Sequence, residues 1–322
     1  MKKTNTIRKT VLATAVTALV GGAATIVNAT EPCGDFGECK ALVEINAEDG
    51  DIGFHFLMDG DALIYGAVFN PRHRKIFTYY PRRELRRQTS TELFQESAEP
   101  PCSAAVAEDG DDVVTLRQFT RRWKTGTYYF FGINSDWEPQ WGTTELTFDL
   151  PAAPAELEWE VEEDEPGEFE GEISWEPGDD LGECSDELED LIDEGVVADP
   201  YGVDVAIWEV VLEVDVDVEE EEDEDLLAAA NAKYVVRIPG NTETEDGRLE
   251  VEVPDDFLET LPEDTPAKVE VGAIGPDDNA TFAEEGDICL NDTDPEGIYD
   301  EDEDALLNGC GFEVEEEEPD DE

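Results

Sequence analysis

Two stretches of the sequence gather carboxylates closely enough to bind a metal ion. In the first, two Asp-Gly-Asp triplets follow a glutamate, and the acids are Glu44, Asp49, Asp51, Asp59 and Asp61. Calcium takes about six to eight oxygen ligands, and two turns at one end of neighbouring strands could present these side chains to one ion. Asp-Gly is also the preferred sequence of tight turns, so a purely structural role competes with calcium binding.

The second stretch matches the spacing of a calcium-binding loop, with Gly297 where that loop turns sharply. The acid-rich half of the chain gives about 0.3 such matches by chance. Pro295 and the lack of a preceding helical pattern count against a helix-loop-helix site. Calcium is the one cofactor that the sequence suggests. The candidate ligands of this second stretch are Asp292, Asp294, Glu296, Asp300 and Glu303.

The motifs argue against catalysis. The two histidines, His55 and His73, have no recognisable nucleophile setting, and GxSxG, HExxH and phosphate-binding glycine loops are absent from the sequence. A glycosidase needs only two carboxylates at a suitable separation, which a chain with 86 acids cannot exclude. We expect a non-catalytic binding or adhesion-type surface module; a secreted polysaccharide hydrolase is the alternative.

The charge is divided unevenly along the chain. Residues 151–322 carry 65 acidic and four basic side chains, whereas residues 1–150 carry 21 and 16, for a net charge of −66. Such a surface stays hydrated at high salt, where counterions screen the repulsion, and destabilises the compact state at low salt. Adaptation to high salt therefore explains most of the acidity without any specific ligand.

The basic residues of the first half form a patch interleaved with aromatic residues. Arginine beside aromatic rings can bind nucleic acid or acidic glycans, but the polyanionic half would repel either. We expect this patch to dock acidic segments, within or between molecules, which predicts self-association and makes nucleic acid an unsuitable partner. The patch comprises Arg72, Arg74, Lys75, Arg82, Arg83, Arg86, Arg87, Arg117, Arg121, Arg122 and Lys124.

Trp137 and Trp141 flank Glu138 in a stretch that we expect to be a loop. Two tryptophans placed this way could stack a sugar ring. We favour the alternative, in which both side chains fold back over the neighbouring hairpin as a small extension of the core.

The N-terminus has the features of an export signal. A basic segment precedes an uncharged apolar run and the triplet Val27-Asn28-Ala29, so we expect residues 1–29 to be a signal peptide cleaved after Ala29. An uncleaved membrane anchor is the competing interpretation. Cleavage predicts a secreted or periplasmic protein.

Six cysteines follow the signal peptide, and an even number in an exported chain indicates disulfides rather than a metal site. The sequence contains no CxxC pair and no Cys/His cluster, which are the usual motifs of a zinc site. We predict pairing of Cys39 with Cys102 and of Cys184 with Cys289, which leaves Cys33 and Cys310 without an assigned partner.

The prolines around residue 151 and the change in charge there predict a domain boundary. We expect an all-β protein with two tandem sandwich-like domains, the first with short helices, and a disordered acidic tail. The predicted divisions are 30–150, 151–290 and 291–322.

Short β-branched and aromatic runs predict the strands of the first domain, with Asp-Gly turns between them. Thr115 is suited to cap a helix bearing Leu116, Phe119 and Trp123 on one face. The expected strands are 41–45, 51–58, 62–69, 75–80, 127–133 and 143–150 in the first domain, and 157–161, 169–175, 203–218, 234–238, 249–253 and 267–274 in the second.

The segment Glu172-Ile-Ser-Trp-Glu-Pro177 and the alternating strands near 249–253 and 261–271 resemble a fibronectin type III or related immunoglobulin-like module. The resemblance covers roughly residues 155–290. The chain has Ala267 where that family usually places a corner tyrosine, and two acidic insertions exceed its usual loops. The resemblance implies a β-sandwich that acts as a spacer or binding platform, without catalysis.

Overall fold

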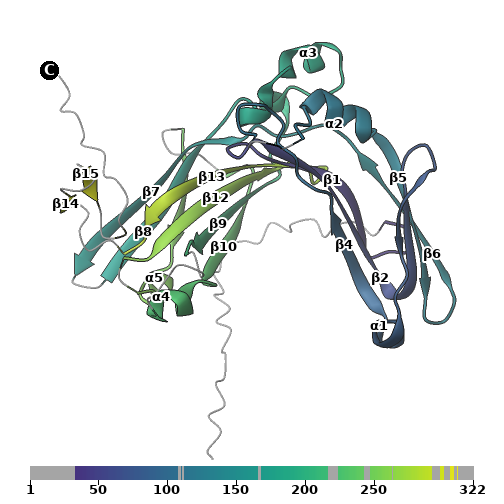
Figure 1. The fold of residues 1–322 in the computed structure, drawn as a ribbon, viewed down its shortest axis with the longest axis horizontal. Helices are drawn as coiled ribbons and strands as arrows, with labels where there is room; N and C mark the ends of the chain where they lie inside the picture. The colour runs from purple at the N-terminus through teal and green to yellow at the C-terminus, as the bar shows by residue number, and fades with distance from the viewer. Residues whose placement is uncertain are drawn as a thin grey trace, which may run out of the picture. The chain divides into compact units, whose positions relative to one another are not determined.

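A computed structural model describes residues 33–107, 110, 112–165, 168–216, 224–242, 247–262, 264–291, 298–300, 305–307 and 310 (Figure 1). The expected signal peptide lies outside these residues. Among the described residues, no helix is long and apolar enough to span a membrane.

The protein is all-β, and its largest element is a ten-stranded sheet drawn from both halves of the sequence. Eight strands form its main path, and two more pair with β2. The path runs β10 (Lys233–Pro239), β9 (Ile207–Val214), β12 (Pro266–Ile274), β13 (Ala280–Cys289), β1 (Glu38–Asn46), β2 (Asp51–Phe69), β5 (Gly126–Asn134) and β6 (Pro139–Leu146), with β3 (Lys75–Tyr79) and β4 (Ser90–Glu96) beside β2.

Pairing of β1 with β13 joins the two halves and is parallel, with Glu44 opposite Ala280 and Asn46 opposite Phe282. Asn279, fully buried beside this ladder, accepts a hydrogen bond from the Val43 backbone at 2.9 Å and donates to Thr147 Oγ1 at 2.9 Å. One buried amide therefore connects strands that are distant in sequence, and it satisfies backbone groups at the junction.

The long strand β2 replaces the two strands expected at 51–58 and 62–69. The turn predicted at Asp59-Gly60-Asp61 was wrong, because these residues continue the strand with a change of register. Gly60 is needed there since a Cβ would lie 2.9 Å from the Phe36 ring. The first part of β2 lies between β1 and β4, and the last part of β2 lies between β3 and β5.

Two short α-helices belong to the N-terminal half, α1 (Arg83–Gln88) and α2 (Leu116–Arg122). The predicted cap of α2 is confirmed, since the Thr115 side chain accepts a hydrogen bond from the Gln118 backbone. α2 buries Leu116 and Phe119, and the ring of Trp123 after it stacks on Phe54 with centroids 4.0 Å apart. The apolar stripe thus anchors α2 on the sheet.

The C-terminal half is a β-sandwich of two sheets. A three-stranded sheet packs on β10, β9, β12 and β13 across a core in which the rings of Trp175 and Trp208 meet edge to face at 5.9 Å. Alternation of buried valine and exposed glutamate along β11 explains why one face is dry and the other acidic. The three strands, in spatial order, are β11 (Leu249–Val253), β8 (Glu168–Pro177) and β7 (Pro154–Glu165).

The acidic insertion after Cys184 packs on the first half. Its Leu188, Leu191 and Val197 are buried in the same cluster as Phe119. Residues on both sides of position 151 therefore share one core. The remaining helical elements are η1 (Gly182–Ser185), α3 (Leu188–Asp193), η2 (Pro200–Gly202), α4 (Glu224–Ala229) and α5 (Asp255–Leu258).

All six cysteines after the expected signal peptide form disulfides, but the predicted pairing was wrong. The bonds join Cys33 to Cys39, Cys102 to Cys184, and Cys289 to Cys310. Cys184 lies just before the insertion that packs on the first half and shares its core, so Cys102 and not Cys289 is its neighbour, at a Cα separation of 5.3 Å. Cys33 lies beside the start of β1, which carries Cys39.

The expected acidic tail is described in three places. β14 (Ile298–Asp300) and β15 (Ala305–Leu307) pair antiparallel, and Cys310 is bonded to Cys289 at the end of β13. The rest of 291–322 beyond Asn291 lies outside the described residues.

Removal of the Cys102–Cys184 bond by a double change to alanine is expected to cost about 4 kcal/mol of unfolding free energy, because the bond closes a loop of 82 residues in the unfolded chain. Denaturant unfolding of the chain from Thr30 onward measures it. The matched control is the double alanine change at Cys33 and Cys39, where the separation is only six residues and the loss should be clearly smaller. Equal losses would contradict the pairing.

Candidate functional site

The strongest candidate site is an acidic cavity of about 250 Å³ next to the β1–β13 junction. Six carboxylates and one lysine line it, and no arginine does. The lining residues are Glu44, Asn46, Asp49, Asp51, Glu99, Lys268, Glu270, Phe282 and Glu284.

Strand alternation brings these acids to one place. Glu44 lies on β1 opposite Gly53 of β2, while Glu270 of β12 lies directly opposite Glu284 of β13. Two like charges opposite each other destabilise a sheet. Lys268 compensates in part, since its Nζ atom lies 2.9 Å from Glu284 Oε2.

His55 is buried between two of the acids, with only 3% of its surface exposed. Its Nε2 atom is 2.8 Å from Glu99 Oε1, and its Nδ1 atom is 3.7 Å from Glu44 Oε2. Gly53 provides the space, because a Cβ there would lie 2.6 Å from Glu99 Oε1 and 2.7 Å from His55 Nε2. Ligand atoms of Glu44, His55 and Glu99 all lie within 4.8 Å of one another.

The carboxylates of the cavity are short of positive charge. Burial, reinforced by Glu99 and Glu270 and opposed by His55, raises the pKa of Glu44 to about 7. Burial, with Glu99 and Asp49 nearby, raises the pKa of Asp51 to about 6. Burial and Glu284 also raise the pKa of Glu270. Each shift means that the folded protein resists a further negative charge here, which is the condition under which a cation or a proton binds.

The structure unites only part of the first predicted calcium site. Glu44, Asp49 and Asp51 line the cavity, and the Asn46 side chain donates to Asp49 Oδ2 at 2.9 Å. Asp59 and Asp61 lie far along β2, since Asp59 pairs with Glu38 while Asp51 pairs with Asn46, roughly 26 Å away along the strand.

Sequence reasoning missed Glu99, Glu270 and Glu284 as members of the cavity, and His55 as the partner of two of its acids. The histidine stood between two phenylalanines of an apparent core strand. Pairing of β12 with β13 brings their acids to the cavity, and Glu99 lies just after β4, whose last residue pairs with His55. Of the second predicted site, Asp292, Asp294, Glu296 and Glu303 lie outside the described residues, and only the backbone of Asp300 is described, on β14.

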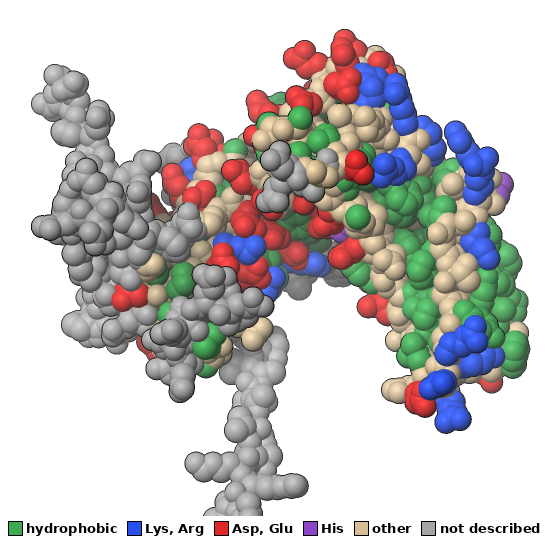
Figure 2. All heavy atoms as spheres, viewed as in Figure 1, with side chains coloured by type: hydrophobic (Ala, Val, Ile, Leu, Met, Phe, Trp, Pro, Cys, Tyr) green, Lys and Arg blue, Asp and Glu red, His purple; other side chains and the backbone are tan. Residues whose placement is uncertain are grey.

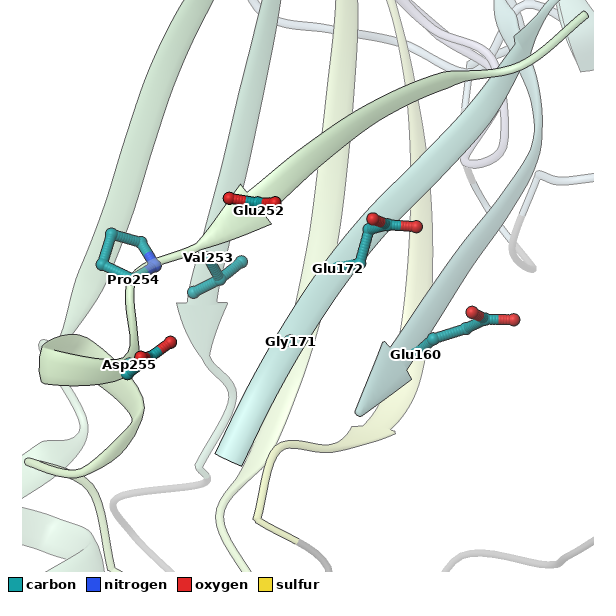
Figure 3. A pocket seen from close by; sticks show the side chains of 7 residues that line it. All are labelled: Glu160, Gly171, Glu172, Glu252, Val253, Pro254 and Asp255. Atoms are coloured by element: carbon teal, nitrogen blue, oxygen red, sulfur yellow. The ribbon is translucent and has the colours of Figure 1, made fainter. Parts of the chain in front are cut away.

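A second acidic cavity, of about 510 Å³, lies on the outer face of the three-stranded sheet (Figure 3). Glu160, Glu172 and Glu252 stand directly opposite one another on β7, β8 and β11, and Asp255 lies beside them. Among the described residues, no lysine or arginine is within ion-pair distance of Glu160 or Glu252. We name Glu160, Glu172 and Glu252 the acidic row.

One part of the predicted basic patch docks an acidic segment. Arg117 at the start of α2 pairs with Glu187 at 2.9 Å and with Glu194 at 2.9 Å, both from the acidic insertion. These two carboxylates raise the pKa of Arg117. Arg117 is thus the one member of the predicted patch that makes an ion pair among the described residues. Figure 2 shows the basic side chains near α2 close to acidic ones.

The other ten members of the patch make no ion pair with the residues that the structure describes. They lie at three places: Arg72, Arg74 and Lys75 at the β2–β3 turn, Arg82, Arg83, Arg86 and Arg87 in and before α1, and Arg121, Arg122 and Lys124 at the end of α2.

The expectation that both tryptophans fold back over the hairpin was wrong for Trp137, which is 69% exposed in the turn between β5 and β6. The guanidinium of Arg86 lies 5.7 Å from its ring centre. Trp141 packs on Phe131 with centroids 4.4 Å apart but remains 56% exposed. Both rings are therefore available to a partner.

No known protein family matches the chain, and no curated protein does. Three solved structures that resemble it in part are a biofilm-associated protein (BSP domain), a trypsin-activated alpha-2-macroglobulin from Escherichia coli, and bovine butyrophilin. Their identities to this chain are 12%, 12% and 10%, and their TM-scores are 0.20, 0.21 and 0.19. The alignments cover 79%, 86% and 77% of this chain but 30%, 18% and 94% of those proteins, and such low scores carry no conclusion about function.

The raised pKa values predict a pH dependence of stability in the presence of a chelator. The folded-state pKa of Glu44, about 7, lies above its ordinary value of 4.5, so the folded chain binds more protons than the unfolded chain between these pH values. The contribution of Glu44 to the free energy of unfolding is therefore greatest below about pH 4.5, and it is lost as the pH rises to about 7.

We expect Glu44→Gln to raise the melting temperature at pH 8 and to flatten the fall between pH 5 and pH 8, measured by thermal unfolding at constant ionic strength. Glu48→Gln, an exposed change in the turn after β1, is the matched control and should leave the slope unchanged. A wild-type slope in Glu44→Gln would show that the pH dependence arises elsewhere.

Proposed function

We propose that this protein is an exported, non-catalytic β-sandwich binding module that holds a divalent cation in the cavity beside the β1–β13 junction. The observation that carries the proposal is His55, buried between Glu99 and Glu44, two of the six carboxylates that line a cavity with only one lysine. A divalent cation supplies the positive charge that this cavity lacks.

Two kinds of cation fit different parts of the cavity. A set of one imidazole and two carboxylates suits zinc or a similar transition metal, whose ligand atoms lie about 2.0–2.2 Å from the ion. The oxygens of Asp49, Asp51 and Glu284 would instead suit calcium, which is the cofactor expected from the sequence. Because His55 is buried at the centre of the candidate ligands, we propose that zinc binds more tightly than calcium.

The strand order supports a fibronectin type III-like module in the C-terminal half. The three-stranded sheet β11-β8-β7 faces β10-β9-β12-β13, and Trp175 of the segment that carried the resemblance is fully buried between them. A module of this kind presents ligands at its edges and loops rather than in a catalytic cleft. The disulfides and the expected signal peptide support export.

The test is thermal unfolding of the chain from Thr30 onward with chelator, zinc, calcium and sodium at equal ionic strength. An ion that binds only the folded state raises the melting temperature with the logarithm of its concentration. We expect a saturating rise with zinc, a smaller one with calcium, and only the screening effect with sodium. Glu99→Gln should abolish the zinc-specific rise, while the matched control Glu92→Gln, exposed on β4 and paired with Asp59, should keep it.

Equal gains from all three ions in the wild-type chain would contradict the cation site and leave salt adaptation as the explanation of the acidity. Hydrolysis of a polysaccharide by the chain, lost in Glu44→Gln, would instead support the hydrolase alternative.

A further inference from the structure

We propose that the arginine-rich corner at α1 docks on the acidic row of a second copy of this chain. We name Tyr80, Arg82, Arg83, Arg86, Arg87 and Trp137 the arginine corner. The proposal concerns a surface separate from the cation cavity, so it stands or falls independently of the proposed function.

The corner holds cations that have no ion-pair partner among the described residues. All four basic residues of the C-terminal half, Lys233, Arg237, Arg248 and Lys268, make ion pairs, and so do Lys40 and Arg117. Within the described residues, the four arginines of the corner make none, although the chain carries 86 acidic and only 20 basic residues. In the part of the chain that the structure describes, these four adjacent arginines thus have no ion-pair partner, and a partner from outside can reach them.

Aromatic rings hold two of these guanidinium groups, those of Arg82 and Arg86, in place. The Cζ atoms of Arg82 and Arg86 lie 5.0 Å and 5.5 Å from the Tyr80 ring centre, and Arg86 also lies 5.7 Å from that of Trp137. Tyr80 is 52% exposed, and α1 buries none of its residues. Stacked arginines keep their outward N–H groups free and lose less entropy when they bind a carboxylate.

The same chain carries the complementary surface. In the acidic row, Glu160, Glu172 and Glu252 lie side by side across three strands, where like charges repel. Figure 3 shows the three side chains projecting from neighbouring strands on one face of the sheet. Guanidinium groups inserted along this row would relieve the repulsion and form charge-assisted hydrogen bonds.

The large net charge does not prevent such a contact at moderate salt. With a Debye length of about 8 Å at about 0.15 M salt, only charges near the contact act on one another. The two surfaces differ, so the contact is head-to-tail and can continue from one copy to the next. An extended assembly of exported chains is its expected product.

The test is sedimentation velocity of the chain from Thr30 onward, in chelator, at increasing protein concentration. We expect concentration-dependent association at about 0.15 M NaCl that weakens at about 1 M NaCl. The charge reversals Arg82→Glu with Arg86→Glu, and separately Glu172→Arg with Glu252→Arg, should each weaken association at least about tenfold. An equal mixture of the two variants should form a dimer, because each retains the surface that the other has lost.

Two further measurements keep the result decisive. Arg72→Glu with Arg74→Glu, at the other end of β3 and equally unpaired in the described structure, is the matched control and should associate like the wild type. Thermal unfolding of every variant verifies folding, and Arg82→Gln with Arg86→Gln replaces any reversal that unfolds. A monomeric wild-type chain would overturn the proposal, and so would retention on an acidic polysaccharide that depends on Arg82 and Arg86 without any association.

Discussion

The short parallel ladder between β1 and β13 is the constraint on which the rest of the structure depends. Three residue pairs join a strand near residue 44 to one near residue 281, and the buried Asn279 amide links both to the segment at Thr147. This ladder makes one sheet from two halves that differ greatly in charge. It also brings Glu44 and His55 to the acids of β12 and β13, and so creates the cavity.

Electrostatics then divides the molecule into compensated and uncompensated regions. Alternating strands send glutamates to the outer faces, where water and salt screen most of them. The cavity differs, since burial raises the pKa of Glu44 and Asp51 and the one lysine there is shared with Glu213 and Glu284. The arginine corner instead has an excess of positive charge among the described residues. A cation could neutralise the cavity, and an acidic partner could neutralise the arginine corner.

The local elements were predictable where a short-range pattern sets them. Alternation of apolar and acidic residues predicted β11 and also β9, which is shorter at both ends than the expected strand 203–218. Thr115 before an apolar stripe predicted α2. The Asp-Gly-Asp triplet at 59–61 misled, because the packing of Phe36 over Gly60 decides that the strand continues. Turn preference is a local signal, and a tertiary contact overrode it.

The sequence by itself determined the all-β class, the division of charge, the presence of disulfides and the grouping of Glu44 with Asp49 and Asp51. These follow from composition and from spacings of a few residues, on which the chain geometry acts directly. Only the tertiary structure decided that Cys184 bonds Cys102, that His55 and Glu99 complete the cavity, and that Trp137 is exposed beside Arg86. Each of these joins residues more than forty positions apart in the sequence, and burial of the whole core rather than any local pattern brings them together.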